Sequence, residues 1–178
     1  MKTLFALVLA TSLFLTSAFA EKRFVYSSAG GAVTVYSVDL ETGKLTKIQE
    51  KPGSGLTAIC SEQKHLYRVG GGVLESYEIQ SDGTLKSLGM SETTERAGYL
   101  ALDANERFLA GNNYGGGTAT VWKIGDDKVG VGEPVATIQL EKAAHSSVFS
   151  PGNGFLLVPA TTPNKVFQIR FDEKSGEI

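Results

Sequence analysis

The sequence predicts an all-β fold, a β-propeller built from four-stranded antiparallel blades. The chain has 21 glycines among 178 residues, and short apolar runs alternate with turn residues. No segment shows a sustained helical period with caps. One strand pattern occurs four times, beginning at Phe24, His65, Phe108 and Phe155, so the copies are separated by 41, 43 and 47 residues. This spacing is typical of propeller blades.

The first twenty residues are expected to lie outside the fold. Lys2 gives a positive start, Leu4 to Leu15 is largely apolar, and Ala18-Phe19-Ala20 is a small-x-small cleavage pattern. This arrangement predicts a secretory signal peptide over residues 1–20, too short for a membrane span. We therefore expect a periplasmic or secreted protein whose folded part covers residues 21–178.

We call Phe24, His65, Phe108 and Phe155 the anchor residues of the four repeats. The strand that starts at each anchor is followed by a second strand that carries an aromatic residue. The aromatic residues lie 12, 12, 14 and 12 positions after the anchors, and they are Tyr36, Tyr77, Trp122 and Phe167. The register is thus kept, with one two-residue insertion. The insertion falls in the glycine hairpin 115–117, where a loop tolerates it.

Two further strands complete the repeat. Tight turns stand before Leu45, Leu85, Val129 and Ile178, where the outer strand is expected to begin. An inner strand precedes the anchor at 56–61, 98–103 and 145–150. The predicted repeats cover about 21–54, 55–97, 98–144 and 145–178. The first lacks an inner strand and the last stops where its outer strand should begin. We therefore expect an open, incomplete arc of about four blades, with further blades of the same chain as its natural partners.

Charge and cysteine content argue against several classes of function. The formal net charge is −2 and basic residues are scattered, which gives no footprint for nucleic acid or an anionic membrane. A lone cysteine, Cys60, lies in an apolar run and is expected to be a buried small side chain. No CxxC, HExxH or paired-histidine spacing occurs, so neither a metal site nor a cofactor is indicated.

Register counting selects the candidate catalytic residue. Ten residues before the anchors of repeats two to four stand Gly55, Gly98 and His145, and this position is expected at the mouth of a central channel. An imidazole there could act as an acid or base, or it could hydrogen-bond a neighbouring loop. Arg96 and Asn112 are weaker candidates for substrate binding, with a solvated surface arginine and a turn cap as the alternatives.

The later part of the chain resembles the seven-bladed propeller lactonases of the 6-phosphogluconolactonase type. The similarity rests on residues 109–117 followed by TATVWKI, which is similar to a Val-x-Val strand of the family, on His145-Ser146 with Ser150-Pro151, and on the strand from Phe155 to Pro159. Two positions depart from many members, since Ala143 stands where a second histidine is common and residues 160–164 replace an Asp-Leu-Gly-x-Asp sequence. The resemblance implies seven blades, of which about four are present here.

The resemblance also implies a function, the metal-independent hydrolysis of a sugar lactone. His145 would be the acid or base, and the family site also uses an arginine and a glutamate from later blades that this sequence does not contain. The name-giving substrate is a cytoplasmic phosphorylated lactone, so an exported member is expected to act on another lactone. The alternative is a non-catalytic propeller that binds a partner or ligand at its channel mouth.

Overall fold

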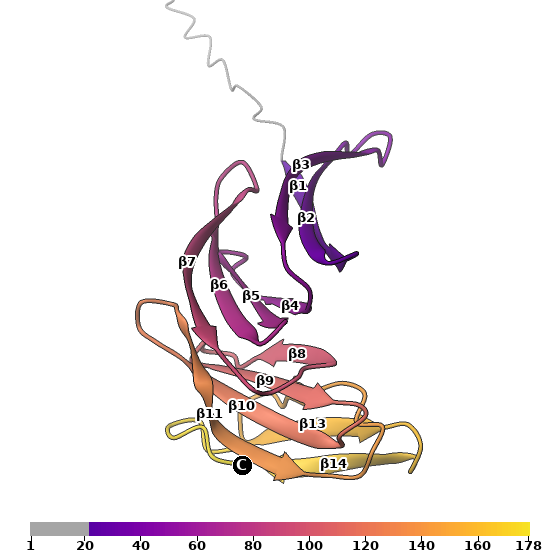
Figure 1. Ribbon diagram of the computed structural model, residues 1–178, viewed down its shortest axis with the longest axis vertical. Coiled ribbons are helices and arrows are strands. Elements are labelled where there is room, and N and C mark those ends of the chain that lie inside the picture. Colours follow the sequence, from indigo (N-terminus) through magenta and orange to yellow (C-terminus); the bar gives the residue numbers. More distant parts are fainter. Residues whose placement is uncertain (1–21) are drawn as a thin grey trace, which may run out of the picture.

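The structure is an open arc of four antiparallel β-sheets that follow one another in sequence order (Figure 1). It is a computed structural model that describes residues 22–178, so the predicted signal peptide lies outside the described residues. The described part contains strands and no helix, and no sheet closes on itself. The predicted all-β fold with an incomplete propeller arc is therefore confirmed.

Each sheet is one blade. The first blade has three strands, β1 (Arg23–Ala29), β2 (Ala32–Val38) and β3 (Leu45–Pro52). The second has four, β4 (Leu56–Ile59), β5 (His65–Gly70), β6 (Val73–Ile79) and β7 (Leu85–Glu92). The third also has four, β8 (Tyr99–Leu102), β9 (Phe108–Asn113), β10 (Thr118–Ile124) and β11 (Gly130–Gln139). The fourth has β12 (Val148–Phe149), β13 (Phe155–Ala160) and β14 (Lys165–Arg170).

In three blades the register shifts at the aromatic residue of the strand that pairs with the outer strand. The shifts lie at Val35/Tyr36, at Ser76/Tyr77 and at Val121/Trp122. A β-bulge bends the strand and strengthens its twist. These three blades therefore twist at an equivalent point, which lets them stack in the same way.

Apolar side chains fill the space between successive blades. The first interface is formed by Val33, Val35, Leu66, Tyr77 and Leu85. The second contains Tyr67, Val69, Leu74, Leu100, Leu109, Trp122 and Ile124, and the third contains Phe108, Val121, Phe149, Leu156, Val158, Ile169 and Phe171 with smaller neighbours. A four-stranded sheet has two apolar faces, so each blade is stable only when it packs against its neighbours.

The turns behave as their residue types predict. Gly71 and Gly72 both have positive φ, 64° and 84°, and close the β5–β6 hairpin in a conformation that glycine adopts without steric cost. In the third blade the hairpin is wider, and only Gly117 has positive φ there. The two-residue insertion predicted at this hairpin is therefore present as a longer loop, and it carries Tyr114.

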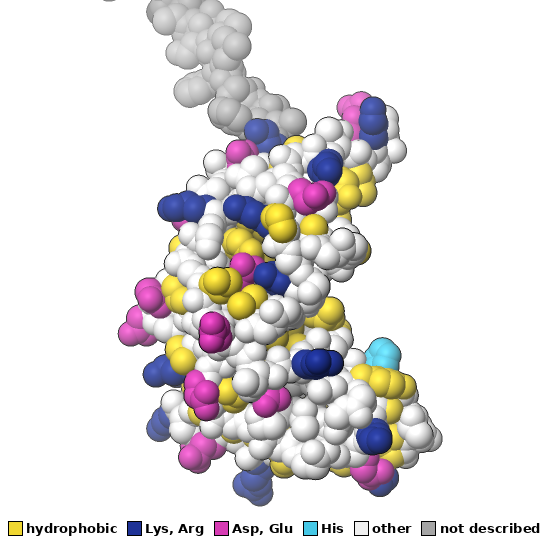
Figure 2. Space-filling model, viewed as in Figure 1, with side chains coloured by type: hydrophobic (Ala, Val, Ile, Leu, Met, Phe, Trp, Pro, Cys, Tyr) yellow, Lys and Arg dark blue, Asp and Glu magenta, His cyan; other side chains and the backbone are white. Residues whose placement is uncertain are grey.

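The surface of the arc mixes both signs of charge, as the face in Figure 2 shows. Within residues 22–178, the structure contains no helix with the length and apolarity that a membrane span requires.

Candidate active site

The site predicted at His145 lies where the fourth blade begins. The His145 backbone N–H donates to the Pro159 carbonyl at 2.8 Å, and the Gly98 N–H donates in the same way to the Asn112 carbonyl at 2.5 Å. Each donor stands ten residues before its anchor and each acceptor four residues after it. His145 and Gly98 therefore occupy equivalent positions just before the inner strands of their blades.

The imidazole of His145 is exposed and rests against a tyrosine of the third blade. Its ring makes an edge-to-face contact with the ring of Tyr114, with centroids 5.8 Å apart and planes at 80°. The Tyr114 hydroxyl lies 3.3 Å from the Thr161 Oγ1 in the β13–β14 turn. The widened hairpin of the third blade thus supplies an aromatic wall that limits the orientations open to His145.

The backbone before His145 is held by the same hairpin. The Ala143 N–H donates to the Tyr114 carbonyl at 2.8 Å, and the Thr161 N–H donates to the Ala143 carbonyl at 3.0 Å. Ala143 is buried and has a φ of +68°, a left-handed conformation that costs an L-residue about 1–2 kcal/mol. Ala144 then pairs with Ala160 in an isolated β-bridge. These bonds hold a strained backbone segment next to the imidazole.

Asn112 lies beneath this segment and is 1% exposed. Its Nδ2 donates a hydrogen bond to the Ala144 carbonyl, and its Oδ1 accepts one from the Ser147 hydroxyl at 3.3 Å. The amide thus bonds to residues on both sides of His145. The structure places Asn112 as a support for the segment, and its predicted substrate contact stays a prediction.

Arg96 lies at the same end of the inner strands, in the connection from β7 to β8. Its side chain is exposed and lines a cleft of about 590 Å³ together with Ser54, Gly55 and the Gly70–Gly72 hairpin. That cleft does not include His145. The structure therefore brings together His145, Asn112 and Tyr114 and leaves Arg96 in a neighbouring cleft of the same rim.

This arrangement suits proton transfer at an exposed substrate. It offers one accessible imidazole, whose backbone is held by a hydrogen bond to Pro159 and whose ring contacts Tyr114. Histidine is the residue type that most readily accepts and donates protons near neutral pH. A group that must move a proton in a transition state gains from being held in one orientation.

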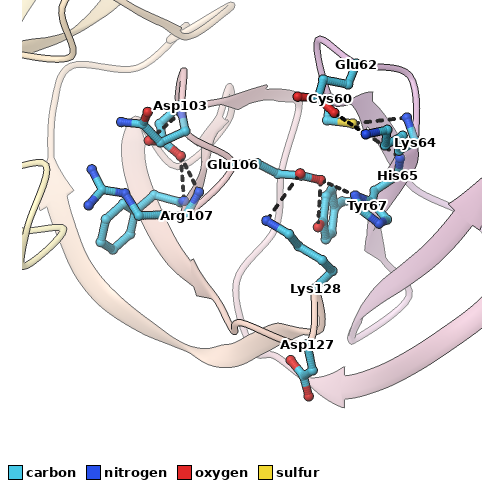
Figure 3. Close-up of polar contacts among 12 residues, drawn as sticks. Cys60, Glu62, Lys64, His65, Tyr67, Asp103, Glu106, Arg107, Asp127 and Lys128 are labelled. Atoms are coloured by element: carbon cyan, nitrogen blue, oxygen red, sulfur yellow. Dashed lines mark hydrogen bonds and ion pairs between the residues drawn. The ribbon is translucent and has the colours of Figure 1, made fainter.

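A second polar cluster, not indicated by the sequence analysis, lies at the other end of the inner strands (Figure 3). It contains Cys60, His65 and Glu106, whose potential ligand atoms all lie within 4.8 Å of one another. Cys60 directly follows β4, whereas His145 precedes β12. Local spacing gave no sign of this cluster because Glu106 is 41 residues from His65.

Sequence comparison relates most of the chain to lactonases. Residues 25–178 match the family model described as "Lactonase, 7-bladed beta-propeller". The chain is 32% identical over 158 residues to the 6-phosphogluconolactonase of Serratia proteamaculans, covering 85% of this chain and 47% of that protein. The same protein of Yersinia enterocolitica is 32% identical over 152 residues, covering 82% and 45%. The chain thus spans about half the length of these curated relatives.

Solved structures share the fold at lower sequence identity. The periplasmic gluconolactonase PpgL of Pseudomonas aeruginosa superposes with a TM-score of 0.69 at 21% identity, covering 86% of this chain and 47% of PpgL. Hydrazine synthase of Kuenenia stuttgartiensis superposes with a TM-score of 0.55 at 12% identity, covering 83% and 54%. Enzymes of different activity thus contain this arrangement of blades, so the structural likeness shows the fold alone.

Proposed function

The chain belongs to the family of seven-bladed β-propeller lactonases, and on this basis we propose that the whole protein hydrolyses a sugar lactone with His145 as its acid or base. The observation that carries the proposal is the exposed imidazole at the start of the fourth blade, whose backbone is held by Pro159 and whose ring contacts Tyr114. The relatives named 6-phosphogluconolactonase support a lactone as the substrate class.

In this proposal, neutral His145 takes a proton from a water molecule as its oxygen attacks the lactone carbonyl. The tetrahedral intermediate carries the negative charge on the former carbonyl oxygen. When it collapses, the ring C–O bond breaks and the imidazolium returns its proton to the leaving alkoxide, which yields the open hydroxy acid. General acid–base catalysis of this kind contributes typically about 10²- to 10⁴-fold to a rate. Donors that stabilise the oxyanion would add to this.

Asn112 and Arg96 receive different roles in the proposal. Asn112 is a positioning residue, because its buried amide bonds the residues that flank His145. Arg96 would attract an anionic group on the substrate from its exposed position on the rim. The Arg96 guanidinium would attract a phosphorylated lactone more strongly than an unphosphorylated lactone.

The proposed location is the periplasm or the exterior of the cell. The signal-peptide pattern of residues 1–20 supports it, as does the likeness to a gluconolactonase described as periplasmic. A lactonase in that compartment would meet unphosphorylated sugar lactones in preference to phosphorylated metabolites. We therefore propose an unphosphorylated aldonolactone as the preferred substrate.

The test measures lactone opening by the protein expressed from its whole coding region. Acid release from gluconolactone and from 6-phosphogluconolactone is followed for the wild type and for His145→Ala, His145→Gln and Arg96→Gln. We expect the His145 variants to lose at least about 100-fold in kcat with both lactones. Arg96→Gln should raise KM for the phosphorylated lactone alone.

A change far from His145 serves as the matched control. Lys44→Ala changes an exposed residue in the β2–β3 turn of the first blade and should leave turnover unchanged. If the His145 variants turn over as fast as the wild type, His145 has no part in the chemistry. If no lactone is opened by the wild type, the alternative of a non-catalytic binding propeller is favoured.

A further inference from the structure

The turn after each inner strand repeats one arrangement, in which a side chain at the start of the turn accepts hydrogen bonds from backbone N–H groups at its end. Its first residue is Cys60, Asp103 or Ser150, and its side chain accepts a backbone N–H from the start of the next strand. Asp103 Oδ1 accepts from Phe108 at 2.7 Å, Ser150 Oγ accepts from Phe155 at 3.1 Å, and Cys60 Sγ accepts from His65 at 3.2 Å. Cys60 also accepts from the Lys64 N–H at 3.3 Å. The Cys60 thiol thus receives a backbone N–H that a carboxylate and a hydroxyl receive in the equivalent turns of the next two blades.

The fourth residue of each turn has a left-handed backbone. Gln63, Glu106 and Asn153 have φ values of 56°, 53° and 56°. Asn153 reaches back to the preceding blade, where its Nδ2 donates to Asp103 Oδ2 at 3.0 Å and its Oδ1 accepts from the Ala104 N–H at 3.2 Å. Asparagine is common in this conformation and glutamate is not. Asparagine, which stands at the equivalent position of the fourth blade, would adopt the backbone conformation of Glu106 with less strain.

Glu106 also reaches back one blade, and there it meets other potential ligands (Figure 3). Its Oε1 lies 2.7 Å from His65 Nδ1 and accepts a hydrogen bond from the Tyr67 hydroxyl at 3.0 Å. Its Oε2 lies 3.4 Å from the Lys128 ammonium group. The side chains of His65 and Glu106 are each 17% exposed, and a cleft of about 410 Å³ opens onto them and onto Cys60. A small ion can therefore reach the cluster from solvent.

We propose that Cys60, His65 and Glu106 bind a zinc-like divalent cation that joins the second and third blades. A thiolate, an imidazole and a carboxylate are ligands that zinc accepts, and one water would complete a tetrahedron. Tetrahedral zinc holds such atoms roughly 3.4–3.6 Å apart, whereas the three potential ligand atoms all lie within 4.8 Å here. The most widely separated ligand atoms therefore need to close by about 1.4 Å at most, whereas His65 Nδ1 and Glu106 Oε1, 2.7 Å apart, need to separate by about 0.7 Å.

Binding requires two changes in protonation and one movement. The Cys60 thiol proton and any proton on the coordinating nitrogen of His65 pass to solvent, because ligands bind a metal in their deprotonated forms. The Lys128 side chain is 34% exposed and can turn outward from Glu106 into solvent. The ion would then connect the two blades as the Asn153–Asp103 hydrogen bond connects the third and fourth.

The repeats supply matched variants for the test. Cys60→Ser introduces the residue that caps the same turn in the fourth blade, and Glu106→Asn introduces the residue that has the same backbone conformation there. Both should keep the fold, although Glu106→Asn relieves backbone strain and at the same time gives up the contacts of the carboxylate with His65 and Tyr67. The whole protein, freed of metal with a chelator, is titrated with Co²⁺ and Zn²⁺ while absorbance and melting temperature are recorded.

We expect Co²⁺ to produce a thiolate-to-cobalt absorption band and Zn²⁺ to raise the melting temperature. Cys60→Ser should abolish the band, and Glu106→Asn should weaken binding by more than about 100-fold, since even second-shell losses cost roughly 10- to 100-fold. Lys128→Gln should tighten binding, because it removes a cation beside the ligand carboxylate. An absent band in the wild type would overturn the proposal, as would Zn²⁺ affinity that is equal in the wild type and both ligand variants.

Discussion

Asn112 of the third blade donates a hydrogen bond to the carbonyl of Ala144, the residue directly before His145 in the fourth blade. The same amide accepts a hydrogen bond from Ser147, two residues after His145. One buried side chain of one blade thereby sets the backbone position of the candidate catalytic residue in the next. The site is consequently a property of the interface between blades, and changes at that interface should affect it.

Asn112→Ala should destabilise the protein by about 1–3 kcal/mol, the cost of leaving a buried polar group without its partner. The Ala144 carbonyl and the Ser147 hydroxyl lose their common partner in this variant. Urea unfolding of the wild type and the variant measures the change. Equal midpoints would show that the two hydrogen bonds do not contribute to stability.

Ala143→Gly should make the protein equally or more stable, by up to about 1 kcal/mol. The φ of Ala143 is +68°, which glycine adopts without steric cost, although glycine also gives the unfolded chain more freedom. Ala143→Val is the matched control, because a β-branched residue is poorly tolerated at positive φ and should lower the midpoint. A lower urea midpoint for the glycine variant than for the valine variant would contradict the inferred strain.

The buried ion pair between Arg68 and Glu75 should be worth much more than an exposed pair. Arg68 is 3% exposed, its Nε donates to Glu75 Oε2 at 2.7 Å, and its Nη1 donates to the Ser54 carbonyl. Arg68→Met leaves the Glu75 carboxylate, whose side chain is 18% exposed, without its cation, and we expect a loss near the lower end of the roughly 3–5 kcal/mol that breaking a buried pair costs.

The comparison uses one further variant and one control. The double variant Arg68→Met/Glu75→Leu removes both charges and should recover much of the lost stability. Lys47→Ala removes a pair whose side chains are 58% and 51% exposed, so the urea midpoint should hardly move. If Arg68→Met costs no more than Lys47→Ala does, the Arg68 pair contributes nothing beyond surface electrostatics.

Much of the fold could be predicted because the spacing found in one repeat can be compared with the spacing in the others. The spacing of Tyr36, Tyr77 and Trp122 from their anchors fixed the register, and the structure shows a register shift at each of these residues. Counting ten residues before the anchors likewise found the backbone position shared by Gly98 and His145. A periodic pattern constrains a propeller strongly, since every blade must meet the next in the same geometry.

The side-chain contacts could not be predicted in the same way. Nothing local to Tyr114 indicates that the widened hairpin would place it against His145, because that contact crosses from one blade to the next. Cys60 was expected to be a buried small side chain, and it is buried, yet its sulfur accepts two backbone hydrogen bonds. Contacts across blades depend on loop conformations, which sequence periodicity does not specify.

Stability should fall as the pH rises through the window from about 10 to about 12. Burial, with the hydrogen bond to Glu75, raises the pKa of Tyr77 to about 12, whereas an unfolded tyrosine titrates near about 10. Burial also raises the pKa values of Tyr67 and Tyr26. Between the two values the folded chain keeps a phenolic proton that the unfolded chain has lost, so the free energy of unfolding decreases with pH.

Tyr77→Phe removes one of these groups and should make the decline shallower. Near pH 7 the variant should lose only about 1 kcal/mol, the net value of its hydrogen bond of 2.5 Å to Glu75 Oε2. Urea unfolding at pH 7, 9, 10 and 11, values that lie on both sides of about 10, where an unfolded tyrosine titrates, gives both slopes. An unchanged slope in Tyr77→Phe would mean that this phenol is not what links alkaline pH to unfolding, and the decline would then be assigned to Tyr67 and Tyr26.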